Sequence, residues 1–599
     1  MGINRKTEEK KMSMSKNIAR LAVTAGLTAA LSFGGVMAPV SMAFAAEGST
    51  VTFSDTGYDK TSTYKGIQIF KATVTTTDGA KTVSNIEWAS DDAKAAVVAA
   101  IKEKNSSYTS EYAQDAADWL SDNAGTDSKV ASDNVLSSIA AKLDGKDGWQ
   151  TTTAGSPSLS GLDAGYWLFL TATAGKPDGE STDGFTSPVY AVIDGESTTT
   201  VTPKKDVPTV EKKVLDDADA VSDDIKGSDK WKDVADSQIG QEVNYKLTGT
   251  IASNYATFST YAYKFTDVLS DGLDYVDGSV EVYAVNHDGY NKIDGSKYEV
   301  ACDNNTLTVD FKVDGTKKGL KDVADVDANT QIVVFYKAKL NSNAVIGNAA
   351  NDKKGGNPNT VKLEYSNNPY AAGTGETIED TVADFAFKLN LNKVDQGTEK
   401  GLAGAVFTIQ SDDANTNGQY VASKTDTTAG VVAGQLVTVA NVNNLPDYVM
   451  FTSGNDGKIA VSGLDAGSYK VTEVKAPDDS YTKANPFTFK ITAKYDDATM
   501  KVTELKAKVS ESDKVRTDIA FGTLDGTAGD NVLQGQDKTG TNADAGEVTI
   551  NVGNTKSVGL PLTGLNGVTF TWIAGGAVLC IGVAHLIRSR KQAEESEQE

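Results

Sequence analysis

The chain reads Gly-Leu-Asp-Ala-Gly-Ser-Tyr-Lys-Val at residues 463–471, a glycine-containing turn that leads into an alternating strand-like run. The same turn occurs at residues 161–169, as Gly-Leu-Asp-Ala-Gly-Tyr-Trp-Leu-Phe. A turn signal that leads into such a run predicts a strand of a β-sheet. An internal repeat indicates a repeated structural unit. The first and last parts of the chain are therefore expected to share a β scaffold.

Strand patterns recur at even spacing outward from this repeat. Alternating or β-branched runs lie at Glu242–Thr250, Ala262–Thr266, Val280–Val285, Thr306–Val313, Gln331–Leu340 and Thr360–Tyr365, and a further series extends from Phe385–Val394 to Val548–Val552. Many of the turns between these runs contain Asp-Gly, which is typical of hairpins. The spacing predicts a mainly β fold of tandem immunoglobulin-like β-sandwich domains.

The first part of the chain adds helices to its strands. Helical patterns lie at Asp91–Lys104, where Ser90 is the expected N-cap, and at Glu111–Leu120 and Asn134–Leu143. Strand-like segments flank them at Val51–Phe53, Ile67–Phe70 and Tyr166–Thr173. We therefore expect a β-sandwich with helical insertions in this part of the chain.

The N-terminus has the pattern of a secretory signal. Six Lys and Arg residues lie between Arg5 and Arg20, followed by the apolar run Leu21–Met42 and the small-residue stretch 43–46. A basic region, a hydrophobic region and a small-residue cleavage site together predict export. Translation from Met12 or Met14 is an alternative start, because a polar stretch precedes the second basic region.

The C-terminus combines three features in order. Leu565–Ile587 is mostly apolar and long enough to span a bilayer. A basic group follows it, and the pentapeptide Leu560, Pro561, Leu562, Thr563, Gly564 precedes it. This order resembles the sorting signal of sortase substrates, which implies that a transpeptidase cysteine attacks the Thr563–Gly564 bond and passes the Thr563 acyl group to an amine. An ordinary single-span membrane protein is the alternative.

The composition excludes several classes of function. Hydrophobic residues make up 39% of the chain and charged residues 23%, which is an ordinary globular composition. The only His residues are His287 and His585, and the only Cys residues are Cys302 and Cys580, so a His-dependent triad or a multi-His metal site is not expected. The net charge of −24 argues against nucleic-acid binding. No cofactor and no metal are expected.

Four motifs of the last block resemble the collagen-adhesin B-type domain of Gram-positive pilins. They are Asn390–Asp395, Leu402–Phe407, the E-box-like stretch Thr472–Pro477 and Thr549–Lys556. The resemblance implies an internal isopeptide bond, in which Lys393 condenses with Asn554 and Glu473 is the catalytic acid. Burial would support this chemistry, because it favours a neutral Lys amine and a protonated Glu. Asn551 lies three residues away and is the alternative electrophile.

The middle block resembles the second, collagen-adhesin A-type domain of fimbrial shaft pilins. The resemblance rests on Pro208–Val214, Tyr263–Leu269 and Asn359–Pro369. It implies that Lys212 bonds to an Asn with Asp267 in the acid role. Val210, Lys212 and Val214 share a strand face, which favours Lys212 over Lys213. Asn359 is the chosen partner and Asn367 is its rival.

The first block lacks the acid that these bonds need. Continuing the repeat without a gap places Thr171 opposite Glu473, so no internal bond is expected there. The segment after this block, Thr200 to Lys204, resembles the pilin motif, which implies that the Lys204 amine accepts the acyl group of the next subunit. Thr202 stands where the family has an aromatic residue, and Lys205 is a substitute acceptor.

The resemblance covers nearly the whole chain and implies a sortase-assembled major (shaft) pilin of the FimA and SpaA type. We expect a signal peptide at 1–46, an N-terminal pilin domain at 47–203, a middle isopeptide domain at 204–378, a C-terminal E-box domain at 379–557 and a sorting signal at 558–599. Subunits would join through Thr563 and Lys204 into a wall-anchored pilus that supports adhesion, and the plasma membrane would hold the precursor.

The expected partners are identical subunits, a pilin-specific class C sortase, a housekeeping sortase and peptidoglycan. Minor tip or base pilins and host surface ligands are further candidates. No enzymatic activity beyond formation of the internal bonds is expected. A monomeric wall-anchored adhesin and a surface enzyme such as a glycosidase are the rival interpretations.

Overall fold

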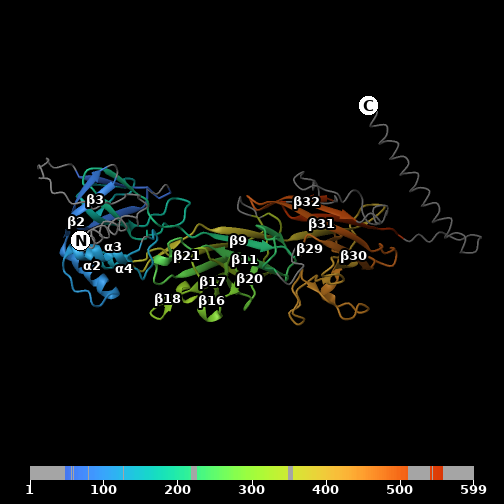
Figure 1. Ribbon diagram of the computed structural model, residues 1–599. Coiled ribbons are helices and arrows are strands. Elements are labelled where there is room, and N and C mark those ends of the chain that lie inside the picture. Colours follow the sequence, from blue (N-terminus) through green and yellow to red (C-terminus); the bar gives the residue numbers. More distant parts are fainter. Residues whose placement is uncertain are drawn as a thin grey trace, which may run out of the picture.

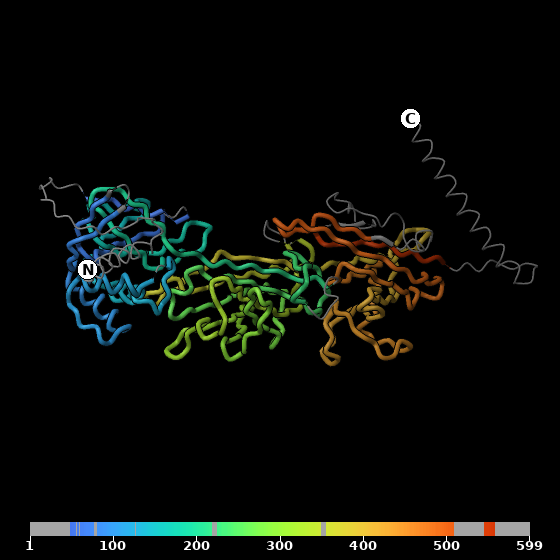
Figure 2. Tube along the Cα trace, viewed as in Figure 1, coloured from blue at the N-terminus to red at the C-terminus, as the bar shows by residue number. Residues whose placement is uncertain are grey.

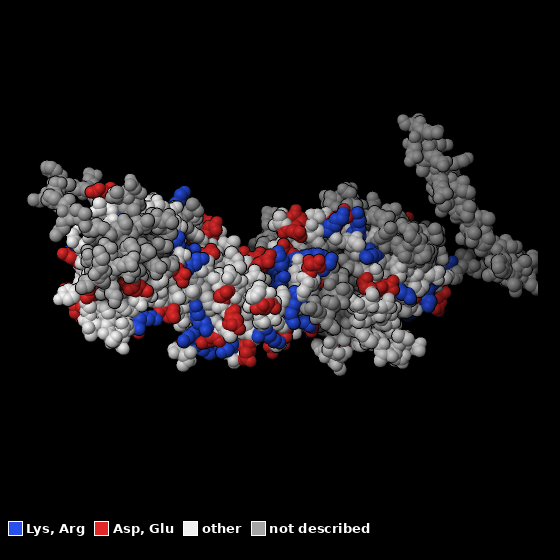
Figure 3. Space-filling model, in the orientation of Figure 1, with Lys and Arg blue, Asp and Glu red and all other residues white. Residues whose placement is uncertain are grey.

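A computed structural model describes residues 48–556 except 55–56, 59, 78–79, 126, 218–224, 349–354, 510–539 and 543. Three β-rich domains follow one another along an elongated molecule, the N-terminal one at one end and the C-terminal one at the other (Figures 1 and 2). Lys and Asp or Glu side chains are interspersed over the middle domain on the face drawn in Figure 3, so the negative net charge is not gathered into one patch there.

The N-terminal domain packs two sheets against each other and three helices against the outer face of the larger one. The sheet orders are β5-β1-β8 and β3-β2-β6-β7, with β4 on β2. Its elements are β1 Ser49–Phe53, β2 Thr63–Thr77, β3 Ala80–Trp88, α2 Asp91–Lys104, α3 Ala113–Asn123, α4 Val135–Leu143, β4 Gln150–Thr151, β5 Ser158–Leu162, β6 Gly165–Thr173, β7 Val189–Ile193 and β8 Thr198–Val201.

Strand β6 explains why this domain has two cores. Trp167 and Phe169 point into the core between the two sheets, whereas Leu168 and Leu170 point into the core beneath the helices. Successive side chains of a strand face opposite sides of the sheet, so a continuous apolar run is buried on both faces. The run at Tyr166–Thr173 therefore forms the centre of the domain.

The middle domain is a sandwich of two sheets with orders β10-β23-β21-β12-β17-β16 and β15-β14-β20-β11-β9. Strand β22 pairs with β21, β13 with β20 and β18 with β19. Its elements are β9 Val210–Leu215, β10 Val234–Asp236, β11 Glu242–Gly249, η2 Tyr255–Thr257, β12 Tyr263–Leu269, β13 Leu273–Tyr275, β14 Glu281–Asn286, β15 Gly289–Lys292, η3 Gly295–Lys297, β16 Glu299–Asp303, β17 Thr306–Phe311, β18 Val313–Asp314, β19 Lys317–Lys318, η4 Leu320–Asp322, β20 Gln331–Leu340, β21 Asn357–Ser366, β22 Thr374–Glu376 and β23 Asp380–Phe385.

The C-terminal domain is a third sandwich, with sheet orders β29-β24-β34-β33 and β27-β26-β25-β30-β31-β32 and with β28 on β25. Its first strand lies parallel to its last one in the same sheet. Its elements are β24 Phe387–Asp395, β25 Val406–Ser411, β26 Tyr420–Val421, β27 Leu436–Val437, η5 Asp447–Val449, β28 Phe451–Thr452, β29 Lys458–Leu464, β30 Ser468–Lys475, β31 Phe487–Asp496, β32 Lys501–Val509, β33 Gly540–Asn542 and β34 Glu547–Asn554.

Hydrogen bonds join neighbouring domains. The loop before β7 meets the middle domain, where the Phe185 amide donates to the Asn367 carbonyl at 2.7 Å. The Ile239 amide donates to the Gly463 carbonyl of the C-terminal domain at 3.0 Å. Strand β23, which lies beyond the expected boundary at residue 378, pairs with β21 and β10 of the middle sheet.

The expected fold class is confirmed: the protein is mainly β, its sandwiches follow one another in tandem, and the N-terminal one carries the helices. Helix α2 has the expected bounds, and Ser90 caps it by accepting a hydrogen bond from the Ala93 amide at 3.1 Å. Helix α3 begins two residues later than expected and ends three residues later.

Candidate functional site

Three polar side chains meet in the core of the C-terminal domain. Lys393 projects from β24, the first strand, and is fully buried. Asn554 ends β34, the last strand, two residues beyond Val552, the register partner of Lys393. Glu473 projects from β30 in the opposite sheet. The structure therefore brings together all three residues predicted for this domain.

Hydrogen bonds orient the acid and the amide of this trio. Asn554 Nδ2 donates to Glu473 Oε1 at 2.8 Å, and the Ala484 amide donates to Glu473 Oε2 at 2.6 Å. Lys393 Nζ donates to the Val552 carbonyl at 3.0 Å. Burial raises the pKa of Glu473, against the opposing charge of Lys393. Asn554 Oδ1 is buried and accepts no hydrogen bond from the described residues.

The strand face distinguishes the two asparagines of β34. Asn554 shares the core face with Val548, Ile550 and Val552, because these residues alternate along the strand. Asn551 lies on the other face, where its Oδ1 accepts a hydrogen bond from Asn392 Nδ2 at 2.9 Å. The structure places Asn554, and not Asn551, beside the acid.

A second trio spans the two sheets of the middle domain. Lys212 lies on β9, whereas Asp267 on β12 and Asn359 on β21 belong to the facing sheet. All three side chains are fully buried, and Lys212 Nζ forms an ion pair with Asp267 Oδ2. The predicted Lys212, Asp267 and Asn359 are thus brought together in one core.

Burial moves both members of this ion pair toward their neutral forms. It lowers the pKa of Lys212 from 10.5 to about 8, against the opposing charge of Asp267. It also raises the pKa of the Asp267 carboxyl. Asp267 Oδ1 and Asn359 Oδ1 are buried and form no hydrogen bond with the described part of the chain. The amide oxygen of this trio is therefore open to polarisation by a protonated acid.

The rival residues of the middle domain lie elsewhere. Asn367 Nδ2 donates to the Asp183 carbonyl at 3.1 Å, so Asn367 contacts the N-terminal domain instead of Lys212. Lys213 points to the other side of β9, where its Nζ lies 2.6 Å from Asp233 Oδ1. Neither rival is bonded to Asp267.

Sequence reasoning missed Tyr336 of β20, which lies at the centre of the middle trio. Its hydroxyl accepts hydrogen bonds from Lys212 Nζ at 2.8 Å and from Asn359 Nδ2 at 2.6 Å. It donates to Asp267 Oδ2 at 2.9 Å. The run Gln331–Leu340 had predicted a core strand, and an aromatic residue in such a run gives no signal of a polar contact across the sandwich.

Thr171 occupies the corresponding place in the N-terminal domain. It is buried on β6, and its hydroxyl oxygen accepts a hydrogen bond from the Thr186 amide at 3.0 Å. No carboxyl stands at this position. The expectation of no internal bond in this domain remains a prediction.

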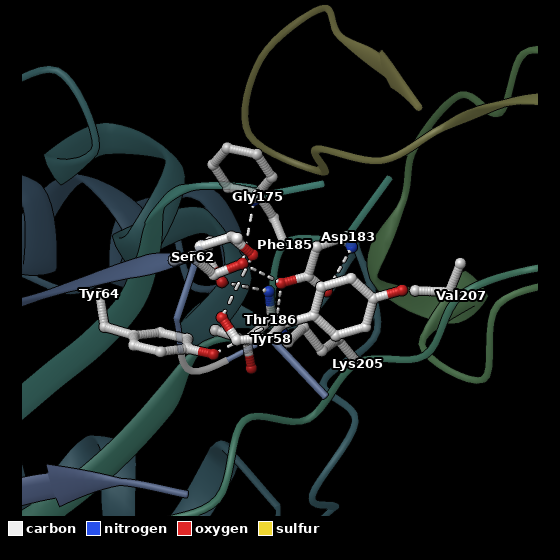
Figure 4. Close-up of polar contacts among 12 residues, drawn as sticks. Tyr58, Ser62, Tyr64, Gly175, Asp183, Phe185, Thr186, Lys205 and Val207 are labelled. Carbon is white, nitrogen blue, oxygen red and sulfur yellow. Dashed lines mark hydrogen bonds and ion pairs between the residues drawn. The ribbon is translucent and has the colours of Figure 1, made fainter. Parts of the chain in front are cut away.

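The two linker lysines differ in their surroundings. Lys205 forms a buried ion pair with Asp183, and its side chain is only 4% exposed. Figure 4 shows this pair beside Ser62 and the rings of Tyr58 and Tyr64. Lys204 is partly exposed, and no side-chain hydrogen bond or ion pair holds its Nζ within the described ranges. Of the two amines, Lys204 is the accessible one.

Both predicted targeting segments, 1–46 and 558–599, lie outside the described residues, and so do the sorting pentapeptide and the apolar run after it. Within residues 48–556, gaps excepted, no helix is both long and apolar enough to cross a membrane.

Two family models match the domains that hold the trios. One is described as "Gram-positive pilin backbone subunit 2, Cna-B-like domain" and matches residues 239–369. The other is described as "SpaA: Prealbumin-like fold domain" and matches residues 387–506. The description of the first model is Cna-B-like, whereas the sequence suggested an A-type fold for the middle domain.

Comparisons with curated proteins and with solved structures give further similarities. The trypsin-resistant surface T6 protein of Streptococcus pyogenes serotype M6 is 24% identical over 332 residues, which are 52% of this chain and 50% of that protein. The chain thus matches about half the length of this curated relative. The solved T6 backbone pilin of that species is 16% identical, with 86% and 100% of the two chains covered and a TM-score of 0.47. The major pilin SpaD of Corynebacterium diphtheriae is 16% identical, with 86% and 99% covered and a TM-score of 0.43.

Proposed function

We propose that this chain is the structural backbone subunit of a covalently polymerised, cell-wall-anchored pilus that supports adhesion, since its middle domain matches a Gram-positive pilin backbone model and its C-terminal domain matches a SpaA model. The observation that carries the proposal is the buried trio of lysine, acid and asparagine in each of these two domains. A lysine charge is costly to maintain in a buried core, whereas the covalent product replaces the amine by a neutral amide.

Each trio supports an internal condensation. The neutral lysine amine attacks the side-chain carbonyl carbon of the asparagine while the protonated acid polarises its oxygen. The new C–N bond forms, the bond to the amide nitrogen breaks, and ammonia leaves. Folding holds the groups in contact, which replaces a bimolecular encounter by a positioned one. Lys393 with Asn554 and Lys212 with Asn359 are the proposed pairs, and Glu473 and Asp267 are the acids.

The joint between subunits is assigned to Lys204 and Thr563. Its support is the accessible amine of Lys204 beside the buried ion pair of Lys205, since an amine must reach the sortase acyl-enzyme to accept its acyl group. A pilin-specific class C sortase would form this joint, and a housekeeping sortase would attach the last subunit to peptidoglycan. The chain itself is a substrate of both enzymes and not an enzyme.

Replacement of Lys204 by Ala tests the polymer. In the native host, the wild-type chain is expected to give a high-mass ladder on a denaturing gel, and Lys204→Ala is expected to give monomer alone. Lys60→Ala removes an exposed lysine of the preceding N-terminal domain and should keep the ladder. A ladder that persists unchanged in Lys204→Ala contradicts the assigned joint. A wild-type chain that never forms a ladder favours a monomeric wall-anchored adhesin.

A further inference from the structure

Tyr336 is the one side chain of the described residues that is hydrogen-bonded to both nitrogens of the middle trio. Its oxygen lies 2.8 Å from Lys212 Nζ and 2.6 Å from Asn359 Nδ2. The ring is buried and stacks on Tyr245 with centroids 5.2 Å apart and planes at 15°. This packing fixes the hydroxyl between the amine that would attack and the nitrogen that would leave.

The acid of this trio does not make the contact that its counterpart makes. In the C-terminal domain, Glu473 accepts a hydrogen bond directly from the leaving nitrogen of Asn554 at 2.8 Å. In the middle domain, Asp267 is bonded to Lys212 and Tyr336, and the amide nitrogen of Asn359 is bonded to Tyr336 instead. Aspartate is one methylene shorter than glutamate, and the tyrosine hydroxyl occupies the intervening place.

We propose that Tyr336 is a catalytic residue of the middle-domain condensation, which carries a proton from Lys212 Nζ to Asn359 Nδ2. This role rests on the proposed formation of an internal bond in this domain. A general acid–base group acts at hydrogen-bond distance from the atoms between which it moves a proton, and the Tyr336 oxygen meets that condition for both nitrogens.

The proton balance is simple. When neutral Lys212 Nζ adds to the Asn359 side-chain carbon, the nitrogen becomes positively charged and must lose one proton. The amide nitrogen loses its conjugation at the same time and gains a lone pair that can accept one. Tyr336 gives its hydroxyl proton to Nδ2 and takes one from Nζ, so ammonia leaves and the hydroxyl is unchanged. Asp267 remains the acid that polarises Asn359 Oδ1.

The state of Tyr336 fits this role. Burial holds the pKa of its hydroxyl well above the usual value of 10, and the neighbouring Asp267 charge acts in the same direction. The residue therefore keeps the proton that it has to donate, and it acts as a relay and not as a phenolate base.

Tyr336→Phe tests the relay, because it removes the hydroxyl and retains the ring. Chains would be collected at intervals after a short pulse of synthesis, denatured and digested, and the cross-linked peptides quantified by mass spectrometry. We expect the Lys212–Asn359 bond to form roughly 100-fold to 10,000-fold more slowly, which is the usual range for loss of a general acid–base group. The Lys393–Asn554 bond of the same molecules should form at the wild-type rate.

Tyr263→Phe is the matched control. Tyr263 is buried in the same core, but its hydroxyl donates to the Thr250 carbonyl at 2.7 Å. This variant loses a buried hydroxyl without touching the trio and should form both bonds at the wild-type rate. Asp267→Glu in the Tyr336→Phe background should restore much of the rate, because the longer acid reaches the leaving nitrogen as Glu473 does.

Two results overturn the proposal. One is a Tyr336→Phe chain that forms the middle bond as fast as the wild type. The other is equal slowing in Tyr263→Phe, because loss of any buried hydroxyl would then explain the effect. A wild-type chain that never loses ammonia from the middle domain contradicts the proposed internal bond itself, and is thus distinguishable from both.

Discussion

Lys212 and Lys393 are fully buried lysines in β-sandwich cores, a placement that is rare for this residue type. Lys212 is paired with Asp267, but a buried ion pair typically repays little of the free energy needed to desolvate its charges. Condensation would remove the lysine amine, because it turns the lysine and asparagine side chains into one neutral amide. At the scale of residues, the burial of both lysines is therefore consistent with their proposed role as reactants.

The intact mass of the chain without its two predicted targeting segments, residues 47–557, reports these reactions directly. We expect the wild type to lack two ammonias relative to its sequence, Lys212→Met and Lys393→Met to lack one each, and the double variant to lack none. Lys213→Met removes the neighbouring lysine that faces the other side of β9, and it should keep both losses. A wild-type body of full mass would exclude the internal bonds.

The pH dependence of stability tests the burial of Lys212. In Asn359→Ala the bond cannot form, so the amine keeps a folded pKa of about 8, whereas that of an unfolded lysine is about 10.4. Between these pH values the unfolded chain binds more protons than the folded one, so the free energy of unfolding rises with pH. We expect the urea midpoint of Asn359→Ala to increase from pH 8 to pH 10.

The control for this titration is Asn359→Ala combined with Lys212→Met. It retains all other groups that titrate in the same window, so the difference between the two variants isolates Lys212. Equal slopes in the two variants would show that the Lys212 amine is not held neutral by the core.

At the scale of elements, the segment that carries Lys204 is fastened by Lys205. The Asp183 carboxylate accepts hydrogen bonds from Lys205 and from the Ser62 hydroxyl (Figure 4). It also accepts one from the Gly184 amide. The carbonyl of Asp183 also accepts a hydrogen bond from Asn367 of the middle domain. One buried pair thus ties the linker to the N-terminal domain at the place where that domain meets the next one.

Lys205→Met should weaken the N-terminal domain strongly. It leaves the Asp183 carboxylate buried without its cation, which typically costs about 3–5 kcal/mol. Urea unfolding followed by tryptophan fluorescence measures this change, since four of the six tryptophans lie in that domain. Lys205→Met combined with Asp183→Leu removes both charges and should recover most of the loss. A single variant that unfolds at the wild-type urea concentration would contradict the role of the ion pair.

Local patterns predicted the elements better than the contacts between them. Helix α2 and strand β20 have the expected bounds, because a capping serine and a β-branched run are local signals. Helix α3 starts late because Tyr112 provides no side-chain cap and the Glu111 carbonyl accepts a hydrogen bond from the Trp88 indole. The start of α3 therefore had no capping residue in the sequence that could mark it.

The alternation of side chains along a strand does not determine which asparagine lies beside Lys212. Alternation places Asn359 and Asn367 on one strand face, and only the position of the neighbouring domain separates them. Tyr336 lies on a strand that is remote in sequence from β9, and its contact with Asn359 arises from the packing of two sheets. The sequence therefore predicted the three members of the trio but not Tyr336, which is hydrogen-bonded to all of them.

At the scale of the whole molecule, the positions of the trios follow the proposed path of tension. The domains lie in a row (Figure 1), so a subunit joined through Lys204 and Thr563 would be pulled along the middle and C-terminal domains. The N-terminal domain precedes Lys204 in the chain and lies outside that path. This explains why the trios occur in two domains while Thr171 occupies the third position.

Each proposed bond would shorten the path that carries force. Tension entering the middle domain would pass from Lys212 to Asn359, and in the C-terminal domain from Lys393 to Asn554. The residues enclosed by each pair, 213–358 and 394–553, would carry no load, whereas the segment from Asn359 to Lys393 would remain on the path of tension. The bond in the C-terminal domain connects the parallel first and last strands, which are neighbours in one sheet.

Single-molecule pulling tests this path. The body would be held by its C-terminal end and by a thiol at position 204, as Lys204→Cys with Cys302→Ser, because Cys302 is exposed and free. We expect the bonded chain to show no extension from the residues enclosed by the two bonds, 213–358 and 394–553. Lys393→Met releases about 160 residues and should add one extension of about 50 nm, at roughly 3.4 Å for each residue. Lys212→Met should add one of similar size from the middle domain.

When the same chains are held by residue 48 instead, the N-terminal domain should unfold in every variant, which verifies that the measurement detects an unbonded sandwich. A bonded chain that already extends by about 50 nm when pulled from position 204 would show that the load does not pass through the trios.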